Sequence, residues 1–184
     1  MRKTIQLTHR VATQQDIPEI ISLMQASIEE NMKAFLTKKE IEAAKETMGV
    51  DKTLLADETY FVIETKQDNQ TILVGCGGWG KRRTLFGGDH TKGRDDSFSD
   101  PATEPARIRA MYTHPKWTRC GIGSYLIELG ESEARKAGFK TIELGSTLAG
   151  EALYLKSGFK EISREVQIGE NGSDNTIIKM SKSL

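Results

Sequence analysis

Apolar residues recur at two different spacings along the chain, and these spacings predict its helices and strands. Apolar positions three and four residues apart predict an amphipathic helix over 13–32, with Pro18 in its first turn. A second helix is predicted from Thr37 to Gly49, because Thr37 and Glu40 have the spacing of a capping box. Runs of β-branched and aromatic residues predict strands over 5–12, 59–65, 71–79, 106–114, 141–146, 160–168 and 175–182.

Two further helices complete the predicted order. A glycine-led amphipathic helix follows the strand 106–114, and a short helix surrounds residues 150–158. A polar turn joins the strands 59–65 and 71–79, which indicates a hairpin. The sequence therefore predicts a mixed α/β fold, of the α+β kind, in which helices flank one sheet. No repeat or linker interrupts the 184 residues, so we expect a single domain over 1–184.

Charge and cysteine content exclude several classes of protein. The chain has 26 basic and 26 acidic residues, so neither nucleic acid nor an anionic membrane is expected as its main partner. Cys76 and Cys120 lack the spacing of a zinc site or a disulfide framework, and no metal is expected. No apolar run is long enough for a signal peptide or a membrane span. We therefore expect a cytoplasmic protein.

The segment 81–105 is polar, punctuated by glycine and without clear periodicity. A loop of this length inside a compact domain is uncommon, and it is usually either functional or disordered. The sequence leaves both readings open. If the loop is functional, its length and polarity predict that it borders the acceptor side of a binding site.

Two glycines near the start of the predicted helix at 121–137 need an explanation, because glycine weakens a helix by about 1 kcal/mol relative to alanine. One explanation is close packing, since Gly123 and Gly130 share a face with the apolar residues and with Ala137. The alternative is an anion site: free N–H groups and the helix dipole attract a phosphate, and a missing Cβ lets it approach. Nearby Lys116 and Arg119 favour the anion site.

Two other glycine patterns fail on inspection. The segment 75–81, GCGGWGK, has the spacing of a triphosphate-binding loop, but Arg82 stands where the magnesium-binding Ser or Thr is needed and no helix is predicted to follow. The dinucleotide pattern G-x-G-x-x-G fails because Leu126 occupies the third glycine position.

The order of elements and two motifs resemble the GNAT superfamily of acetyl-CoA-dependent N-acyltransferases. The family's R/Q-x-x-G-x-G/A loop aligns with residues 118–123, with Thr118 in place of Arg or Gln. The segment 152–159, ALYLKSGF, is similar to the family's A-x-x-Y-x-x-x-G-F. The resemblance implies a mostly antiparallel, splayed sheet. It also implies an acetyl-CoA site formed by Met111, Tyr112, Thr113, Thr118, Arg119, Cys120, Gly121, Ile122, Gly123, Ser124 and Thr147.

The same resemblance implies roles for particular groups in acetyl transfer to an amine. A backbone N–H near Met111 or Tyr112 would stabilise the oxyanion. The Thr147 hydroxyl would bind the pantetheine arm, in place of the asparagine that the family often has. Tyr154 is the candidate general acid, because a phenol with a pKa of ~10 stays protonated at neutral pH and can protonate a thiolate of pKa ~8.5.

The general base stays open, because Arg107 occupies the position where the family often has a glutamate. Alternatives are Glu29, Glu30, His114, Asp89 or a water chain. Cys120 is predicted to be a small filler, and Trp79 to serve either packing or the acceptor pocket.

The sequence thus predicts a GNAT-type N-acetyltransferase that uses acetyl-CoA and acts on a small or peptide amine. A catalytically silent acyl-CoA-binding module is the main alternative, and a nucleotide-binding regulator that uses GCGGWGK is a weaker one. The oligomeric state stays open, with a homodimer as one alternative.

Overall fold

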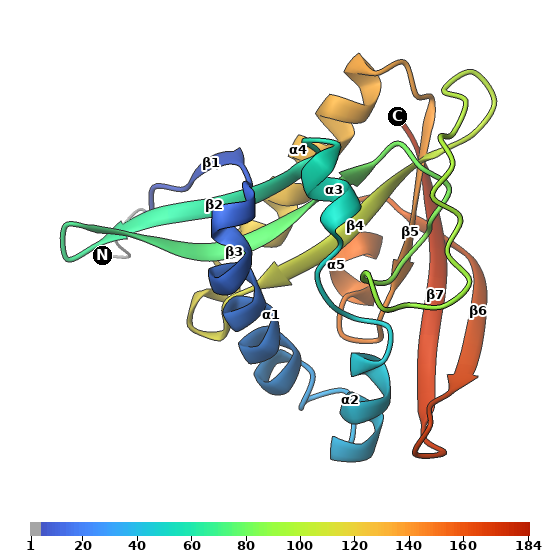
Figure 1. Cartoon of the computed structure of the whole chain (residues 1–184), viewed down its shortest axis with the longest axis horizontal. Helices are drawn as coiled ribbons and strands as arrows, with labels where there is room; N and C mark the ends of the chain where they lie inside the picture. The colour runs from blue at the N-terminus through green and yellow to red at the C-terminus, as the bar shows by residue number, and fades with distance from the viewer. Residues whose placement is uncertain (1–4) are drawn as a thin grey trace.

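The computed structural model describes residues 5–184 and has a seven-stranded sheet at its centre (Figure 1). The strand order is β1-β2-β3-β4-β5-β7-β6, and every neighbouring pair is antiparallel except β4 and β5. The mixed fold and the mostly antiparallel sheet confirm the predicted fold class. The strands are β1 (Thr8–Val11), β2 (Tyr60–Gln67), β3 (Gln70–Gly80), β4 (Ala106–Thr113), β5 (Thr141–Ser146), β6 (Lys160–Ile168) and β7 (Asp174–Ser183).

Helices cover both faces of the sheet. In Figure 1, α1 (Ile17–Asn31) and α3 (Lys52–Ala56) lie in front of the sheet, and α4 (Ile122–Lys136) lies behind it. The front layer continues with α2 (Lys38–Lys45), and α5 (Glu151–Lys156) lies beyond the end of β5. None of the helices in residues 5–184 has the length and apolarity needed to cross a membrane.

Each face of the sheet has its own apolar core. Along β2, Phe61 and Ile63 belong to the cluster that includes α4, whereas Tyr60 and Val62 belong to the cluster that includes α1. Successive residues of a strand point to opposite faces, so an unbroken apolar run such as this one is buried on both sides. The predicted capping box of α2 is present: the Thr37 side chain accepts from the Glu40 N–H at 3.3 Å.

The pairing between β4 and β5 is the feature that creates the site. These two parallel strands pair only at Ala106 with Ile142 and at Arg107 with Glu143. Beyond these two pairs the strands separate, and residues 108–113 of β4 have no partner on β5. The splayed sheet expected from the resemblance is therefore present.

The small residues on one face of α4 do not all pack against the sheet as predicted. Gly130 does pack against the sheet, where an added Cβ would lie 2.8 Å from Ile108 Cδ1. Gly123 instead faces α5: an added Cβ would lie 2.6 Å from Leu153 Cδ2. Ala137 is exposed and follows the last residue of the helix. The small-residue strip therefore packs on the sheet in its middle and on α5 at its start.

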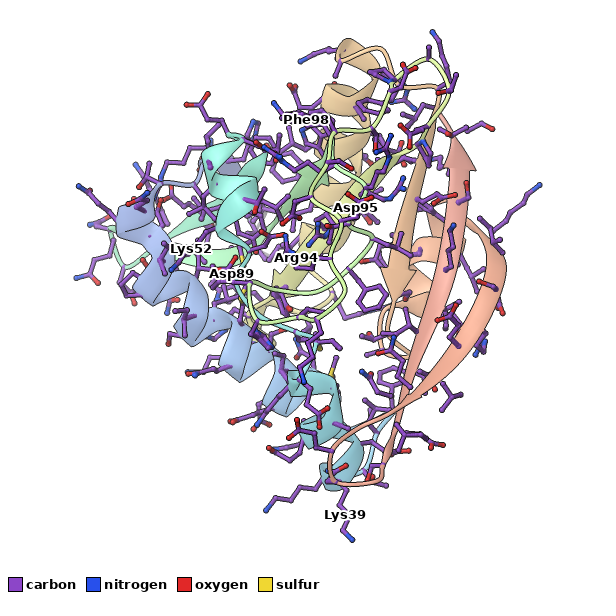
Figure 2. All side chains as sticks on the ribbon, turned by 45° about the vertical axis from the view of Figure 1, so that its right-hand side comes forward. Lys39, Lys52, Asp89, Arg94, Asp95 and Phe98 are labelled. Atoms are coloured by element: carbon purple, nitrogen blue, oxygen red, sulfur yellow. The ribbon has the colours of Figure 1, made fainter. Side chains whose placement is uncertain are left out.

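The loop 81–105 follows a defined path that charged side chains hold in place. Arg82 forms a two-pronged ion pair with Asp57, with both distances 2.7 Å. Arg94 donates to Asp51, to Asp96 and to the Gly88 carbonyl at 2.8–2.9 Å. Figure 2 labels Asp89, Arg94, Asp95 and Phe98 along this loop. These contacts contradict the disordered reading, and the functional reading stays a prediction.

Candidate active site

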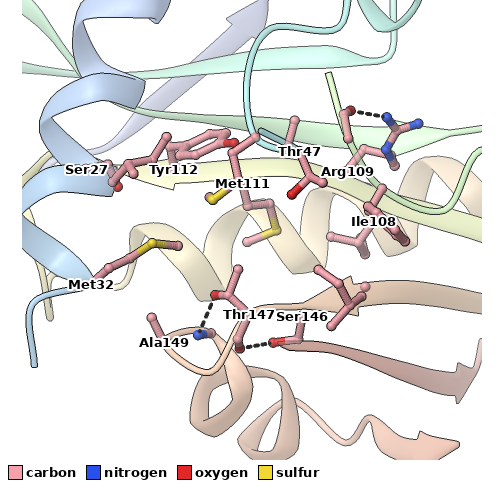
Figure 3. Close-up of a pocket in the computed structure, with 18 of the residues that line it drawn as sticks. Ser27, Met32, Thr47, Ile108, Arg109, Met111, Tyr112, Ser146, Thr147 and Ala149 are labelled. Atoms are coloured by element: carbon pink, nitrogen blue, oxygen red, sulfur yellow. Dashed lines mark hydrogen bonds between the residues drawn. The ribbon is translucent and has the colours of Figure 1, made fainter. Parts of the chain in front are cut away.

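A cavity of about 210 Å³ occupies the gap between β4 and β5 (Figure 3). Every residue from Ile108 to Thr113 on β4 lines it, and the facing wall is formed by residues 145–147, 149, 150 and 154. Figure 3 shows Met111 on one wall and Ser146 and Thr147 on the other. Its remaining lining residues are Ser27, Ile28, Asn31, Met32, Thr47, Met48, Gly49, Leu85, Phe86, Gly87 and Ile177.

A bulge in β4 aims backbone and side chains into this cavity. Cys76 pairs with Tyr112 and Gly78 with Arg109, so Ala110 and Met111 together oppose one residue of β3. Ala110 has a φ of 49°, in the left-handed region that a residue with a Cβ rarely adopts. The Tyr60 hydroxyl donates to the Ala110 carbonyl at 2.7 Å and holds the bulge from the α1 side.

Tyr154 reaches the same bulge from the opposite wall. Its hydroxyl lies 3.8 Å from Met111 Sδ, and its ring packs edge-on against Phe159 with 5.9 Å between centroids. Burial raises the pKa of Tyr154 to about 12. The phenol is therefore protonated throughout the neutral range, as a proton donor must be, and it lies beside the side chain of Met111.

Thr147 lies at the end of β5, also on the wall that faces Met111. Its hydroxyl accepts from the Gly150 N–H at 3.3 Å, and its carbonyl accepts from the Ser146 hydroxyl at 2.7 Å (Figure 3). These bonds fix the turn into α5. Because a hydroxyl can donate as well as accept, Thr147 can still donate one hydrogen bond into the cavity.

The predicted anion cradle, residues 118–124 (the cradle), lies at the start of α4. Gly121 is the N-cap of this helix at a φ of 84°, and Arg119 has a φ of 62°. The first backbone bond of the helix runs from the Tyr125 N–H to the Gly121 carbonyl at 3.0 Å. The three preceding N–H groups therefore have no acceptor within the helix, and they carry the positive end of its dipole.

The two glycines of the cradle, Gly121 and Gly123, are explained by different surroundings. An added Cβ at Gly121 would meet no atom within 4 Å, so the space beside its backbone is open. At Gly123 the added Cβ would collide with Leu153, as described above. Packing against α5 already accounts for Gly123. The prediction that a missing Cβ lets a phosphate approach is therefore kept for Gly121 alone.

The structure places the predicted site residues in two groups. Those that line the cavity are Met111, Tyr112, Thr113, Thr147 and Tyr154. The cradle, Thr118 to Ser124, lies outside the cavity lining at the start of α4. The Cys120 thiol donates to the Thr118 carbonyl at 3.5 Å. Trp79 lies in the core, edge-on to Phe139, so its role is packing.

The four side chains considered as a general base all lie away from the cavity lining. Glu29 pairs with Lys45, and Glu30 pairs with Lys33. His114 accepts from the Lys116 N–H, and Asp89 accepts from the Lys52 N–H at 2.9 Å. Each of them has a local structural partner.

A buried ion pair behind the cavity was not predicted. Arg109 is only 3% exposed, and its guanidinium donates to Asp51 at 2.7 Å and to the carbonyls of Thr84 and Gly87. Burial lowers the pKa of Arg109, and Asp51 opposes this shift. The sequence did hold a signal, since Arg107 and Arg109 alternate in an otherwise apolar strand and both are buried.

Three solved structures share this fold over nearly their whole length. A GCN5-related N-acetyltransferase from Rhodopseudomonas palustris is 17% identical with a TM-score of 0.67, and the alignment covers 100% of this chain and 98% of that one. The PaiA N-acetyltransferase from Thermoplasma acidophilum, in complex with coenzyme A, is 16% identical with a TM-score of 0.60, over 97% and 99% of the chains. YncA, a putative acetyltransferase from Salmonella typhimurium solved with its cofactor acetyl-CoA, is 19% identical with a TM-score of 0.62, over 97% and 94%.

The fold is thus that of the N-acetyltransferases. The sequence model of the Acetyltransferase (GNAT) family matches residues 21–159, well over half of the chain. The chain therefore belongs to the GNAT acetyltransferase family. Comparison with curated protein sequences gives no match.

Phe86 gives a test of the loop's contribution to the site. It lines the cavity and packs against β5 beside Gly145, so Phe86→Ala opens the wall formed by the loop. We expect the KM for the acceptor to rise about 10-fold, because the binding free energy contributed by about one partly buried side chain is lost. Acetyl-CoA affinity should stay at the parent value. Steady-state kinetics and calorimetric titration measure the two quantities.

Phe98→Ala is the matched control, because Phe98 is in the same loop but is 57% exposed and stacks on Arg82. It should leave the acceptor KM unchanged. Equal effects of the two variants on KM would mean that the loop acts through its general stability rather than through the cavity wall.

Proposed function

We propose that the chain is a single N-acetyltransferase domain that transfers acetyl from acetyl-CoA to a primary amine. The observation that carries the proposal is the opening between β4 and β5, where the edge of residues 108–113 that has no partner on β5 and the Tyr154 hydroxyl lie at one cavity. Acyl transfer needs both of these: a backbone donor for the oxyanion and a proton for the leaving sulfur.

Three parts of acetyl-CoA, its pyrophosphate, its pantetheine arm and its thioester, would each have a matching group. The pyrophosphate would bind the free N–H groups of the cradle at Gly121, with Lys116 and Arg119 exposed nearby. The pantetheine arm would run along β4 beside Met111 to Thr113 and accept a hydrogen bond from Thr147. The thioester carbonyl would then accept from the N–H of Met111 or Tyr112, within reach of Tyr154.

Release of the coenzyme A thiol in the presence of a panel of primary amines tests this function. We expect thiol release that depends on the amine and yields the acetylated amine by mass spectrometry. Acetyl-CoA binding without transfer to any amine of the panel would instead favour the catalytically silent module.

A further inference from the structure

The cavity between β4 and β5 offers no free charge to an acceptor. Among residues 5–184, its lining residues include no Asp, Glu, His or Lys, and Arg109 is the one cation among them. Figure 3 draws the Arg109 guanidinium turned away from the gap, and it donates to Asp51 and to the carbonyls of Thr84 and Gly87. The charge of Arg109 is therefore balanced outside the space that an acceptor would occupy.

The polar side chains of the lining are neutral. Burial raises the pKa of Tyr112, and it raises the pKa of Tyr154 to about 12, so both phenols are uncharged at neutral pH. The Asn31 amide is already bonded, because it donates to the Ser27 hydroxyl at 3.1 Å and to the Thr113 carbonyl at 2.8 Å. These groups supply hydrogen bonds, but no charge that could pair with a charged group of an acceptor.

Charged side chains that neighbour the lining along the chain are bonded elsewhere. On α1, Glu30 forms an ion pair with Lys33 at 2.7 Å. Glu46, two residues before Met48, accepts from the Glu170 N–H at 2.8 Å in the turn between β6 and β7. None of these charged side chains lines the cavity. They therefore provide no counter-charge at its wall.

Apolar side chains from four segments form much of the remaining lining. They are Ile28 and Met32 from α1, Met48 from the segment after α2, Leu85 and Phe86 from the loop 81–105, and Ile177 from β7. An added Cβ at Gly145 would lie 3.2 Å from both Phe86 and Ile177, so these two side chains lie against β5. This surface suits an acceptor whose remainder is apolar.

The segment that carries Met48 is held in place by hydrogen bonds. The Thr47 carbonyl accepts from the Gly88 N–H and from the Thr91 hydroxyl, both at 3.2 Å. The Thr47 hydroxyl accepts from the Asn175 amide at 3.2 Å. The segment is thus tied both to the loop 81–105 and to β7, which fixes the position of Met48 at the cavity.

The size of the cavity limits the acceptor. Its volume of about 210 Å³ is below the ~300–1,000 Å³ that is usual for ligand pockets, and the thioester end of the cofactor would share it. A short acceptor therefore keeps its second functional group inside the cavity. If that group is charged, it finds no partner there, and an unpaired charge is costly to bury.

We propose that the acceptor is a small monoamine whose remainder is uncharged and apolar. Amines with a second charge, of either sign, are disfavoured, and this class includes polyamines and amino acids with a free carboxylate. The inference rests on the proposed acetyl transfer. It names the substrate class of that reaction from the uncharged lining and the apolar wall.

A series of three matched acceptors tests this inference. Pentylamine, putrescine and γ-aminobutyrate share an unbranched primary amine and a similar length, and their far ends are methyl, ammonium and carboxylate. We measure kcat/KM for each at saturating acetyl-CoA and one neutral pH. The value for pentylamine should exceed both others by on the order of 10²-fold, equivalent to about 2.7 kcal/mol at 1.36 kcal/mol per factor of ten.

The outcomes separate this inference from the proposed function. Equal or higher kcat/KM for putrescine or γ-aminobutyrate would overturn the uncharged acceptor and leave acetyl transfer intact. A best acceptor with a second charge anywhere in the wider amine panel would do the same. Transfer to no amine at all would overturn the proposed function, and the inference with it.

Charge variants at Met48 test which wall contacts the acceptor. Met48 is only partly buried, so it tolerates a polar replacement better than the buried Met32 does. Met48→Glu should raise the putrescine-to-pentylamine ratio of kcat/KM about 10-fold, because a close charge pair replaces an unpaired ammonium. Met48→Lys should raise the γ-aminobutyrate-to-pentylamine ratio by a similar factor. Met48→Gln is the matched neutral control and should change neither ratio.

Ratios within one variant cancel a general loss of activity or stability, and thermal melts confirm that each variant is folded. Opposite shifts for Met48→Glu and Met48→Lys support the inference, since a purely structural role of Met48 would move both ratios alike. Unchanged ratios in both folded variants would contradict the assignment of this wall to the acceptor. The acceptor series in the parent protein decides on the uncharged acceptor even where a variant does not fold.

Discussion

The Tyr154→Phe variant is expected to lose ~10²-fold or more in turnover number while it folds and binds acetyl-CoA like the parent. A general acid contributes about 10²–10⁴-fold, and the substitution removes only the proton donor. The ring remains, so its contacts with Phe159 and with the cavity wall are kept. The loss should therefore appear in kcat rather than in affinity.

Stability should hardly change, since the hydroxyl's polar contact is Met111 Sδ at 3.8 Å. A weak bond of this kind is worth no more than ~1 kcal/mol. Turnover at saturating amine and a thermal melt of the same sample measure the two effects. Tyr125→Phe serves as the control, because the Tyr125 hydroxyl bonds His9 at 2.5 Å and Tyr125 is not a cavity residue. Parent-like turnover in folded Tyr154→Phe would leave Tyr154 with a packing role and assign the proton to water.

Burial bears on this prediction in a second way. A pKa of about 12 makes Tyr154 a weaker acid than a free phenol, but the leaving thiolate is desolvated in the same cavity and becomes a stronger base for the same reason. Proton transfer depends on the difference between the pKa of the Tyr154 phenol and the pKa of the thiol that leaves. The raised pKa also means that kcat should show no alkaline decline below about pH 10.

Elements with a local signal could be predicted from the sequence. The strands of the sheet are all where β-branched runs placed them, within a few residues. The hairpin between β2 and β3 turns at Asp68 and Asn69, whose φ values of 49° and 64° suit these two residue types. The short helix α3 was missed, because its five residues are too few to show helical periodicity. Asp51, which caps it, was the available signal.

Features that depend on contacts between residues far apart in the sequence could not be predicted. The path of the loop 81–105 is set by Arg82 with Asp57 and by Arg94 with Asp51, pairs separated by 25 and 43 positions. Nothing in the composition of the loop distinguishes these partners from its other charges. The cavity wall formed by α1 and by the segments 47–49 and 85–87 was missed for the same reason. The glycines at the start of α4 and Tyr154 could be proposed as site residues because each lies within a short motif.

The last prediction concerns the cradle, where the structure changes the choice of variant. Gly123→Val would collide with Leu153 and disturb α5, which carries Tyr154, so a loss of binding in that variant would have two explanations. Gly121→Val is cleaner, because its side chain would enter open space beside the free N–H groups. We expect acetyl-CoA affinity to fall about 10²-fold or more, since two charge-assisted hydrogen bonds of ~1.5 kcal/mol each are lost.

Gly172→Val provides the matched control for the backbone. Gly172 has a φ of 76° and the same open surroundings, but it lies in the turn between β6 and β7. Both variants force valine into the left-handed region, so they should share any loss of stability. Gly172→Val should bind acetyl-CoA like the parent, and Thr118→Ala should weaken binding only a few-fold, because the cradle binds through its backbone. Isothermal titration of the four proteins gives the comparison. If Gly121→Val binds as tightly as Gly172→Val, the phosphates bind elsewhere, and the glycine at the start of α4 serves only to begin the helix.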